Sequence, residues 1–204
     1  LFLLSFHELF DGFEILKDAA DAWERAGKPV FLVDHLQLFN EDVEDAKVES
    51  ELNIYAEGPG PFRPDCSGLW DWGSHAVAEA LYLCNATKGK LRSVTSKGPI
   101  ISDSGISELV VINAKFGDVH TTLSVGNGAG VKNHFATSEG KKVFDAATAD
   151  APLTRAVKLF LVAVRTEVVD HRFGMDLPYE GCRFLESVDD ELARQNISRP
   201  QRIA

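Results

Sequence analysis

The sequence lacks the features that direct a chain to a membrane, to a polyanion or to an oxidising compartment. Its longest apolar runs, such as "LFLVAV" at 159–164, fall far short of the ~20 residues that cross a bilayer. Lys and Arg number 21 against 31 Asp and Glu, and a formal charge of −10 disfavours nucleic acid and acidic membranes as partners. Cys66, Cys84 and Cys182 are odd in number and widely spaced, so we expect reduced thiols in the cytoplasm.

Residues 1–35 are expected to form the end of an α/β unit. The segment 13–26 carries apolar residues at helical spacing and is followed by Gly27, a typical C-terminal stop. The apolar run 30–33 shows no alternation, which is typical of a strand buried on both faces of a parallel sheet. Because the chain begins at Leu1 and not at a methionine, we expect it to be a piece of a longer protein.

The remainder, residues 36–204, is predicted to be α+β. An acidic segment at 40–50, with Asn40 as its N-cap, predicts a short exposed helix. "GNGAG" at 126–130 fits a hairpin turn. Strands bounded by glycine, asparagine or proline predict a predominantly antiparallel sheet from 52–58, 90–96, 107–117, 118–128, 131–140 and 141–147.

Alternation within two of these strands predicts an open sheet with helices packed on one face. Val110 and Ile112 point one way, whereas His120 and Thr122 point the other way, so one face should be buried and the other polar. The helices are expected at 68–83, 152–167 and 179–195. The second of them carries an apolar face that should pack on the sheet, made of Leu153, Val157, Phe160, Leu161 and Val164.

The start of the helix at 68–83, "GLWDWGSH", is the candidate site. Asp71 and His75 are four residues apart, so both side chains lie on one helical face. A carboxylate beside an imidazole raises the pKa of the histidine and orients its ring, which suits general acid/base catalysis near neutral pH. Trp70 and Trp72 could form apolar walls for a sugar ring, and Gly73 would let a ligand approach the backbone.

The same residues also have a purely structural interpretation. In this interpretation Asp71 caps the helix and has no catalytic role, and the tryptophans belong to the core. No metal site is expected, because His35 and His171 are distant in sequence from His75. A hydrolase that uses Ser67 or Ser74 is disfavoured because the sequence has no nucleophile elbow.

Several stretches, taken in order, resemble the second domain of the Gfo/Idh/MocA family, named for glucose-fructose oxidoreductase and inositol dehydrogenase. The resemblance covers about residues 13–192. Its most specific element is the Asp-x-x-x-His of "DWGSH", which is similar to the family's catalytic histidine motif. The stretches that carry the resemblance are "VDHLQLFNEDVEDAK", "GPGPFRPDCSGLWDWGSHAVAEALYL", "HFATSEGKKVFDAA", "PLTRAVKLFLVAV" and "DHRFGMDLPYEGCRFLESVDDEL".

The resemblance implies an NAD(P)-dependent oxidoreductase acting on a sugar, a polyol or a related hydroxy compound. His75 would exchange the hydroxyl proton of the substrate, and Asp71 would orient His75 or help to bind the substrate. Residues 1–35 would be the residual end of the dinucleotide-binding α/β (Rossmann) domain, and residues 36–204 the C-terminal substrate-binding and oligomerisation domain. The open sheet face would then join copies of the chain into a homo-oligomer.

The sequence departs from the family pattern where the cofactor should bind. It contains no G-x-G-x-x-G fingerprint, and the stretch that corresponds to the family's Glu-Lys-Pro motif reads "ELFDGFE". Ala78 stands where many members carry a further aspartate. We therefore expect NAD or NADP in the complete protein but not tight binding by this chain alone, and no cofactor-binding residue is assigned. The alternative is a non-enzymatic small-ligand-binding or assembly protein derived from the same domain.

Two further residues are candidates for substrate binding. Arg63 lies in the proline- and glycine-rich loop before the helix, and His35 follows the expected parallel strand. A lone arginine or histidine more often has a structural or surface role. For Arg63 and His35, both substrate binding and such a role are therefore left open. His120, His134 and His171 are taken as structural.

Overall fold

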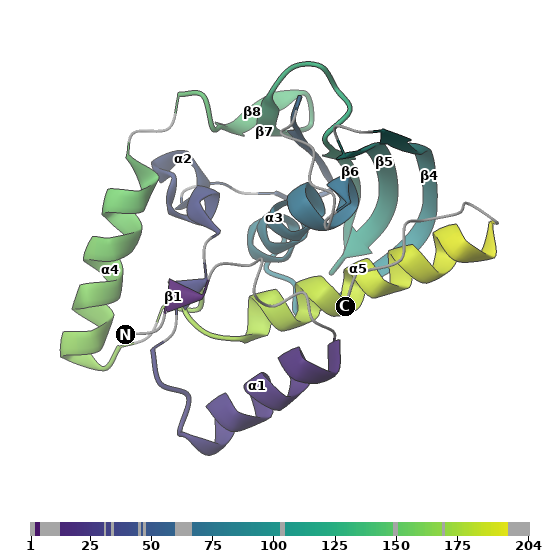
Figure 1. Cartoon of the computed structure of the whole chain (residues 1–204). Helices are drawn as coiled ribbons and strands as arrows, with labels where there is room; N and C mark the ends of the chain where they lie inside the picture. The colour runs from purple at the N-terminus through teal and green to yellow at the C-terminus, as the bar shows by residue number, and fades with distance from the viewer. Residues whose placement is uncertain are drawn as a thin grey trace.

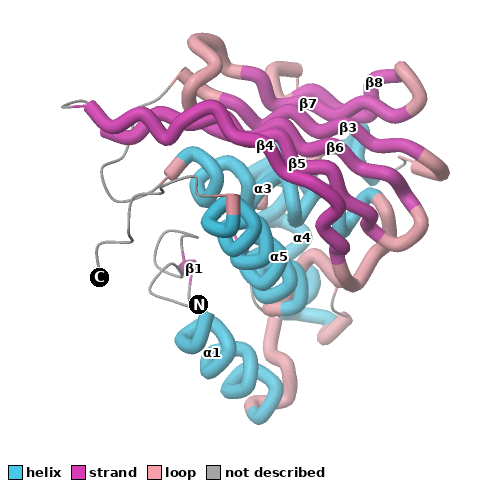
Figure 2. Tube along the Cα trace, turned by 90° about the vertical axis from the view of Figure 1, so that its right-hand side faces the viewer, coloured by secondary structure: helices cyan, strands magenta, loops and turns pink. Residues whose placement is uncertain are grey.

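A six-stranded sheet, covered by helices on one face, organises the protein (Figure 2). The computed structural model describes residues 3–4, 13–30, 32–33, 35–44, 46, 48–59, 67–102, 105–148, 151–168 and 170–195. The strand order β4-β5-β6-β3-β7-β8 confirms an α+β fold with a predominantly antiparallel open sheet. The strands are β3 (Glu51–Glu57), β4 (Gly89–Ser102), β5 (Gly105–Phe116), β6 (Val119–Gly126), β7 (Asn133–Ser138) and β8 (Lys141–Asp145).

The sheet contains one parallel pair, which the sequence patterns did not predict. β3 runs parallel to β6 and antiparallel to β7, so it separates the two strands that flank "GNGAG". The predicted hairpin turn at 126–130 is therefore wrong, because the chain crosses the end of β3 before β7 begins. Gly126 serves a different purpose, since a Cβ there would come within 2.1 Å of the Glu108 carbonyl oxygen. Glycine at this position permits the close approach of β5 and β6.

The alternation of side chains divides the sheet into a covered face and an open face, as predicted. Ile54, Ile112 and Leu123 are fully buried on the covered face. Thr122 and Asn113 lie on the open face, where the Thr122 hydroxyl donates to Asn113 Oδ1 at 3.2 Å. The strands therefore form one apolar core on one side only.

Two long helices cover this core (Figures 1 and 2). α3 (Gly68–Leu83) and α5 (Asp176–Arg194) pack against the sheet and against each other. α1 (Phe13–Arg25) packs on α5. The short strands β1 (Leu3–Leu4) and β2 (Leu32–Val33) pair in parallel, as predicted for the second of them. Within the described residues, no helix combines the length and the apolar composition that crossing a bilayer requires.

The 3-10 helix η2 (Leu36–Phe39) leads into the single-turn helix α2 (Glu41–Glu44). The side chain of Asn40 accepts a hydrogen bond from the Asp42 N–H at 3.2 Å, so it caps α2 as predicted. Val43 is buried, and the remaining side chains of α2 are exposed.

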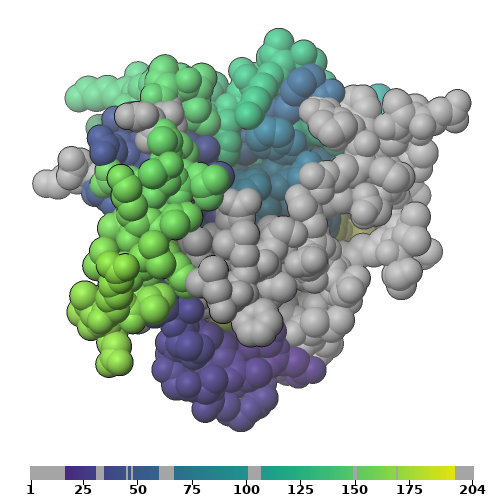
Figure 3. All heavy atoms as spheres, turned by 60° about the vertical axis from the view of Figure 1, so that its left-hand side comes forward, coloured from purple at the N-terminus to yellow at the C-terminus, as the bar shows by residue number. Residues whose placement is uncertain are grey.

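Helix α4 (Pro152–Thr166) does not pack on the sheet, so that prediction is wrong. α3 and α5 already occupy the covered face, and α4 packs beside η2 instead. Its contact side buries Ala156, Phe160 and Ala163 in a second cluster with Leu38, Phe39 and Phe173. Most of the predicted apolar face is exposed, with Leu153 at 56% and Leu161 at 44%. Figure 3 shows α4 (light green) lying on the surface above α1 (purple).

A buried arginine ties η2 and α2 to the segment before α5. The Arg172 guanidinium donates to the Leu38 carbonyl oxygen at 2.9 Å and to the Glu44 carboxylate at 2.8 Å. It also pairs with Asp170 and lies 4.8 Å from the centre of the Phe39 ring. These contacts hold η2, which carries His35 at its start, in one position relative to α5.

Candidate functional site

The start of α3 is held against the sheet by a buried carboxylate from β5. Glu108 is 1% exposed, and its Oε2 accepts a hydrogen bond from the Leu69 N–H at 2.9 Å. Asn127 holds Glu108 in turn, because its Oδ1 accepts the Glu108 N–H at 2.9 Å. A carboxylate at a helix N-terminus accepts a hydrogen bond from a free backbone N–H and interacts favourably with the helix dipole. This arrangement fixes where α3 begins and therefore where His75 stands.

One face of α3 is packed into the core and offers no surface to a ligand. The Trp70 indole, 7% exposed, donates to Asp189 Oδ2 on α5 at 2.5 Å. A Cβ on Gly73 would lie 3.1 Å from Leu185 Cδ2, so this glycine faces α5. The prediction that Gly73 lets a ligand approach the backbone is therefore wrong. The Trp70 indole is directed toward α5 as well.

The other face of α3 gathers a group of histidines. The ring of His35, at the start of η2, meets the ring of His75 edge-on with 5.5 Å between centroids. The ring of His134, on β7, lies 6.4 Å from that of His75. Trp72 approaches His134 edge-on, with 5.9 Å between the two ring centroids. Two segments far apart in the sequence, η2 and β7, thus converge on the second turn of α3.

His35 stays neutral in this group. It is 4% exposed, and burial lowers its pKa well below the usual 6.5, with the nearby charge of His75 lowering it further. A neutral imidazole beside His75 can donate one hydrogen bond and accept another without adding charge to the site.

His134 is fixed by a carboxylate within the helix. Glu79 lies one turn after His75, and its Oε1 is 2.8 Å from His134 Nε2. Both side chains are nearly inaccessible, at 2% for Glu79 and 8% for His134. His134 stands opposite Ala56 in the sheet register and so faces α3.

The predicted site residues have four different outcomes. Trp72, His75 and His35 come together around His134, whereas Trp70 bonds Asp189 on α5. Asp71 lies half-buried in the first turn, where its carbonyl oxygen accepts the Ser74 hydroxyl at 3.1 Å. Its pairing with His75 stays a prediction from their spacing. Arg63 lies outside the described residues.

Sequence reasoning missed Glu79 and His134 as neighbours of His75. The sequence could have pointed to Glu79, because Glu79 is the one charged residue in the apolar stretch 76–83 and stands four residues after His75. His134 carried a weaker signal, because it alternates with the inward-facing Ala136 along β7. A polar residue at an inward position needs a partner, and a search for one would have led to Glu79.

A pocket of about 500 Å³ lies at the edge of the sheet beside His134. Lys142 and Asp145 in its wall form an ion pair at 2.7 Å. Among the described residues that line this pocket, His134 is the one member of the histidine group. The pocket is lined by Lys132, Asn133, His134, Phe135, Lys142, Asp145, Ala146 and Ala147.

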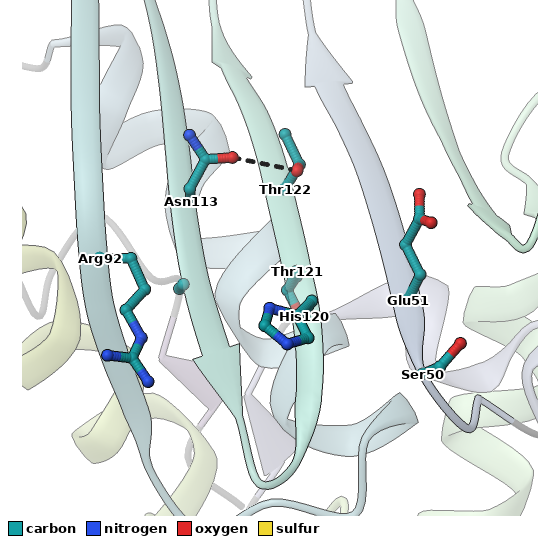
Figure 4. A pocket seen from close by; sticks show the side chains of 8 residues that line it. Ser50, Glu51, Arg92, Asn113, His120, Thr121 and Thr122 are labelled. Carbon is teal, nitrogen blue, oxygen red and sulfur yellow. Dashed lines mark hydrogen bonds between the residues drawn. The ribbon is translucent and has the colours of Figure 1, made fainter.

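A second depression, of about 430 Å³, lies on the open face of the sheet (Figure 4). Arg92, His120 and Glu51 stand around it on three different strands, with Asn113 and Thr122 joined between them. It is separate from His75, because its strands present these side chains on the face opposite to α3. We therefore place the candidate site at the histidine group.

The described residues do not provide a recognisable dinucleotide or metal site. The parallel pair β1 and β2 with α1 is the only part of the described chain that resembles a nucleotide-binding unit, and no glycine fingerprint stands in the sequence. "GNGAG" packs against β5, since a Cβ on Gly128 would lie 2.9 Å from the Ser107 hydroxyl. In the same described residues, no three His, Cys, Asp or Glu side chains are arranged to hold a metal ion.

Comparisons with known proteins define the class to which this fold belongs. No family model and no curated protein matches the sequence. A protein of Magnetospirillum magnetotacticum, provisionally assigned as an oxidoreductase, is 22% identical with a TM-score of 0.68, covering 86% of this chain and 68% of that chain. GenD2 from gentamicin A biosynthesis, solved with NAD, is 14% identical with a TM-score of 0.68 and coverages of 90% and 67%.

The fold of this chain is also similar to that of an inositol dehydrogenase. The scyllo-inositol dehydrogenase of Lactobacillus casei, solved with NAD(H) and scyllo-inositol, is 8% identical with a TM-score of 0.63, covering 90% of this chain and 68% of that chain. The fold is thus that of Gfo/Idh/MocA-type oxidoreductases, and the sheet with its helices matches their C-terminal domain. The chain spans about two thirds of the length of these proteins, with 67% the lowest of the three coverages.

Proposed function

We propose that the chain is the substrate-binding and catalytic part of an NAD(P)-dependent oxidoreductase that acts on a sugar, polyol or related hydroxy compound. The observation that carries this proposal is the half-buried position of His75 on α3, close to the rings of His35 and His134. Solved neighbours with this fold bind NAD(H) and, in one case, scyllo-inositol. His75 would exchange the hydroxyl proton, Asp71 would orient it, and Trp72 would cover one face of the substrate.

We propose that the complete protein binds NAD or NADP, and that this chain alone does not bind it tightly. NAD or NADP would accept hydride from the substrate carbon, but the residues present offer no fingerprint to hold it. We expect the 204-residue chain to bind NADH weakly in a fluorescence titration. Tight binding would contradict the assignment of the cofactor site to other residues.

The open sheet face is the proposed contact between copies of the chain. Tyr55 and Phe135 stack there with ring centroids 4.6 Å apart, and Tyr55 and Val111 are each 36% exposed. Polar rims with aromatic centres are typical of subunit interfaces. Sedimentation analysis should show an oligomer that Val111→Arg dissociates. The free thiol of Cys84 supports the cytoplasm as the location within this proposal.

The decisive test is His75→Asn in the full-length protein. Turnover of the polyol substrate should fall by about 10²–10⁴-fold, the usual contribution of a general acid/base, while the melting temperature stays nearly unchanged. The matched control is His171→Asn, because His171 is exposed and stacks on Tyr82 away from this group. A parallel loss of turnover and stability would favour a packing role for His75.

The alternative function is non-enzymatic binding of a small polar ligand by the same site. The missing fingerprint and the missing Glu-Lys-Pro lysine favour it. It predicts that polyols bind to the chain but that the full-length protein never reduces NAD(P) in their presence, as followed by absorbance.

A further inference from the structure

The open face of the sheet carries a group of basic side chains, although the whole chain has a formal charge of −10. The register places Lys90, Lys115 and His120 next to one another in a single row across β4, β5 and β6. Arg92 stands beside this row and, together with His120, lines the depression of about 430 Å³ on that face. We call these four residues the basic cluster. Cations gathered on an acidic protein create a local positive field that attracts anions.

Two members of the basic cluster repel each other. Lys90 and Lys115 are direct cross-strand partners, and like charges directly opposite each other destabilise a sheet. Lys115 has a carboxylate partner in Asp118, but the two groups are 4.0 Å apart and the Asp118 side chain is fully exposed, so this pair contributes little. Lys90 forms no ion pair with any other described residue. The acidic groups of the described chain therefore offset this repulsion only in part.

A β-bulge directs Arg92 into the depression. The register between β4 and β5 passes from Leu91 opposite Ala114 to Ser93 opposite Asn113, so Arg92 is the extra residue. A bulge bends its strand and changes the direction of a side chain, and bulges are frequent next to functional sites. Figure 4 shows the Arg92 side chain extending along the sheet to the level of the His120 ring.

The basic cluster offers hydrogen-bond donors that the rest of the described chain does not use. The side chains of Arg92 and His120 are exposed, and neither forms a hydrogen bond with another described residue. The guanidinium presents a planar fork of N–H groups that matches two oxygens of a carboxylate or a phosphate. The His120 ring supplies a further N–H from the other side of β5. This end of the depression is thus suited to an oxyanion.

Two other polar side chains that line the depression are already paired. The Asn113 side chain accepts the Thr122 hydroxyl and donates to the Ser93 hydroxyl, at 3.2 Å each. The Glu51 carboxylate accepts the Asn53 amide at 2.7 Å, and Figure 4 shows it turned away from the basic cluster. Neither side chain competes with an anion for the donors of the basic cluster.

We propose that the basic cluster binds a small dianion that carries two carboxylates or one phosphate group. Arg92 and His120 donate hydrogen bonds to its oxygens, and Lys90 and Lys115 supply charge that the anion neutralises. The site lies on the sheet face opposite to α3, so its ligand is neither the substrate nor the cofactor of the proposed function. Glu51 and Tyr55 are four residues apart on β3, so about 13 Å separates this site from the Tyr55–Phe135 contact.

The test is an NMR titration of the whole chain with succinate, inorganic phosphate and the uncharged succinamide at constant ionic strength. We expect one or both anions to shift the backbone amides around the basic cluster and to bind about tenfold more tightly than succinamide, or more. Tighter binding of succinate assigns the site to dicarboxylates, and tighter binding of phosphate assigns it to phosphate groups. No binding of either anion, or equal affinity for succinamide, would overturn the proposal.

The variant that tests the hydrogen bonds is Arg92→Gln. It should weaken anion binding by about tenfold or more while the melting temperature stays unchanged, because Arg92 is exposed. The matched control is Arg183→Gln, which makes the same change of charge on α5, where Arg183 pairs with Glu180. Equal weakening in both variants would show a general charge effect and overturn the proposal. Loss of an oligomer in Arg92→Gln without any anion binding would assign the cluster to a second copy instead, and would also overturn it.

A second variant tests the repulsion within the basic cluster. Lys90→Gln should raise the melting temperature of the ligand-free chain, because it removes the like charge opposite Lys115. It should also reduce the rise in melting temperature that the bound anion causes in the wild-type chain. A lower melting temperature without ligand, or an unchanged rise with it, would overturn the proposed role of the lysines.

Discussion

The helices α3 and α4 are 16 and 15 residues long and both are rich in apolar side chains, yet only α3 is buried. α4 has the clearer apolar stripe, but it buries only Ala156, Phe160 and Ala163. An apolar stripe shows that one face of a helix is suited to burial, but it does not show which element will cover that face. Here α3 and α5 already cover the sheet, so the stripe of α4 stays largely exposed. Because α3 is enclosed on almost every side, its few accessible positions are informative. They include Asp71, Trp72 and His75.

The two tryptophans of α3 should separate packing from ligand binding most strongly. Trp70→Ala removes a buried indole that bonds Asp189, so the free energy of unfolding should fall by about 4 kcal/mol in urea denaturation. Trp72→Ala should cost less than half of this, because Trp72 is half-buried, but it should weaken scyllo-inositol binding. Equal stability losses in the two variants would remove the distinction between the faces of α3.

Two adjacent residues of α4 give the next largest contrast. Phe160 is 8% exposed and packs edge-on against Phe173, so Phe160→Ala should lower the unfolding free energy by about 3 kcal/mol. Leu161 is 44% exposed, and Leu161→Ala should change it by no more than about 0.5 kcal/mol. A large loss from Leu161→Ala in thermal or urea denaturation would show that the exposed stripe is covered in solution.

The smallest expected effect is a pH dependence of the unfolding free energy, which arises from His35 at the contact between η2 and α3. Because the pKa of His35 is lowered in the folded protein, the unfolded chain binds the proton first as the pH falls below 6.5. The stabilisation is complete above this pH and is lost as the pH falls toward the lower folded-state pKa. The slope contributed by His35 is at most about 1.4 kcal/mol per pH unit. His35→Gln should reduce the slope measured between pH 7 and 5, and an unchanged slope would contradict a neutral, buried His35.

The elements themselves were predictable where the pattern is local. Helical spacing at 13–26 and alternation around Ile112 act over a few residues, so α1 and β5 follow from the sequence. The placement of β3 between β6 and β7 was not predictable in this way. It depends on pairing with strands about 70 and 80 residues later along the chain, which no local pattern encodes.

The candidate site divides in the same manner. The sequence by itself determined that Asp71, His75 and Glu79 share one face of a helix, because the helical period sets that geometry without any other contact. Only the tertiary structure decided that His35 and His134 meet this face and that Trp70 is turned away from it. The physical reason is that these contacts depend on how η2, β7 and α5 pack around α3, and packing is settled by the whole core at once.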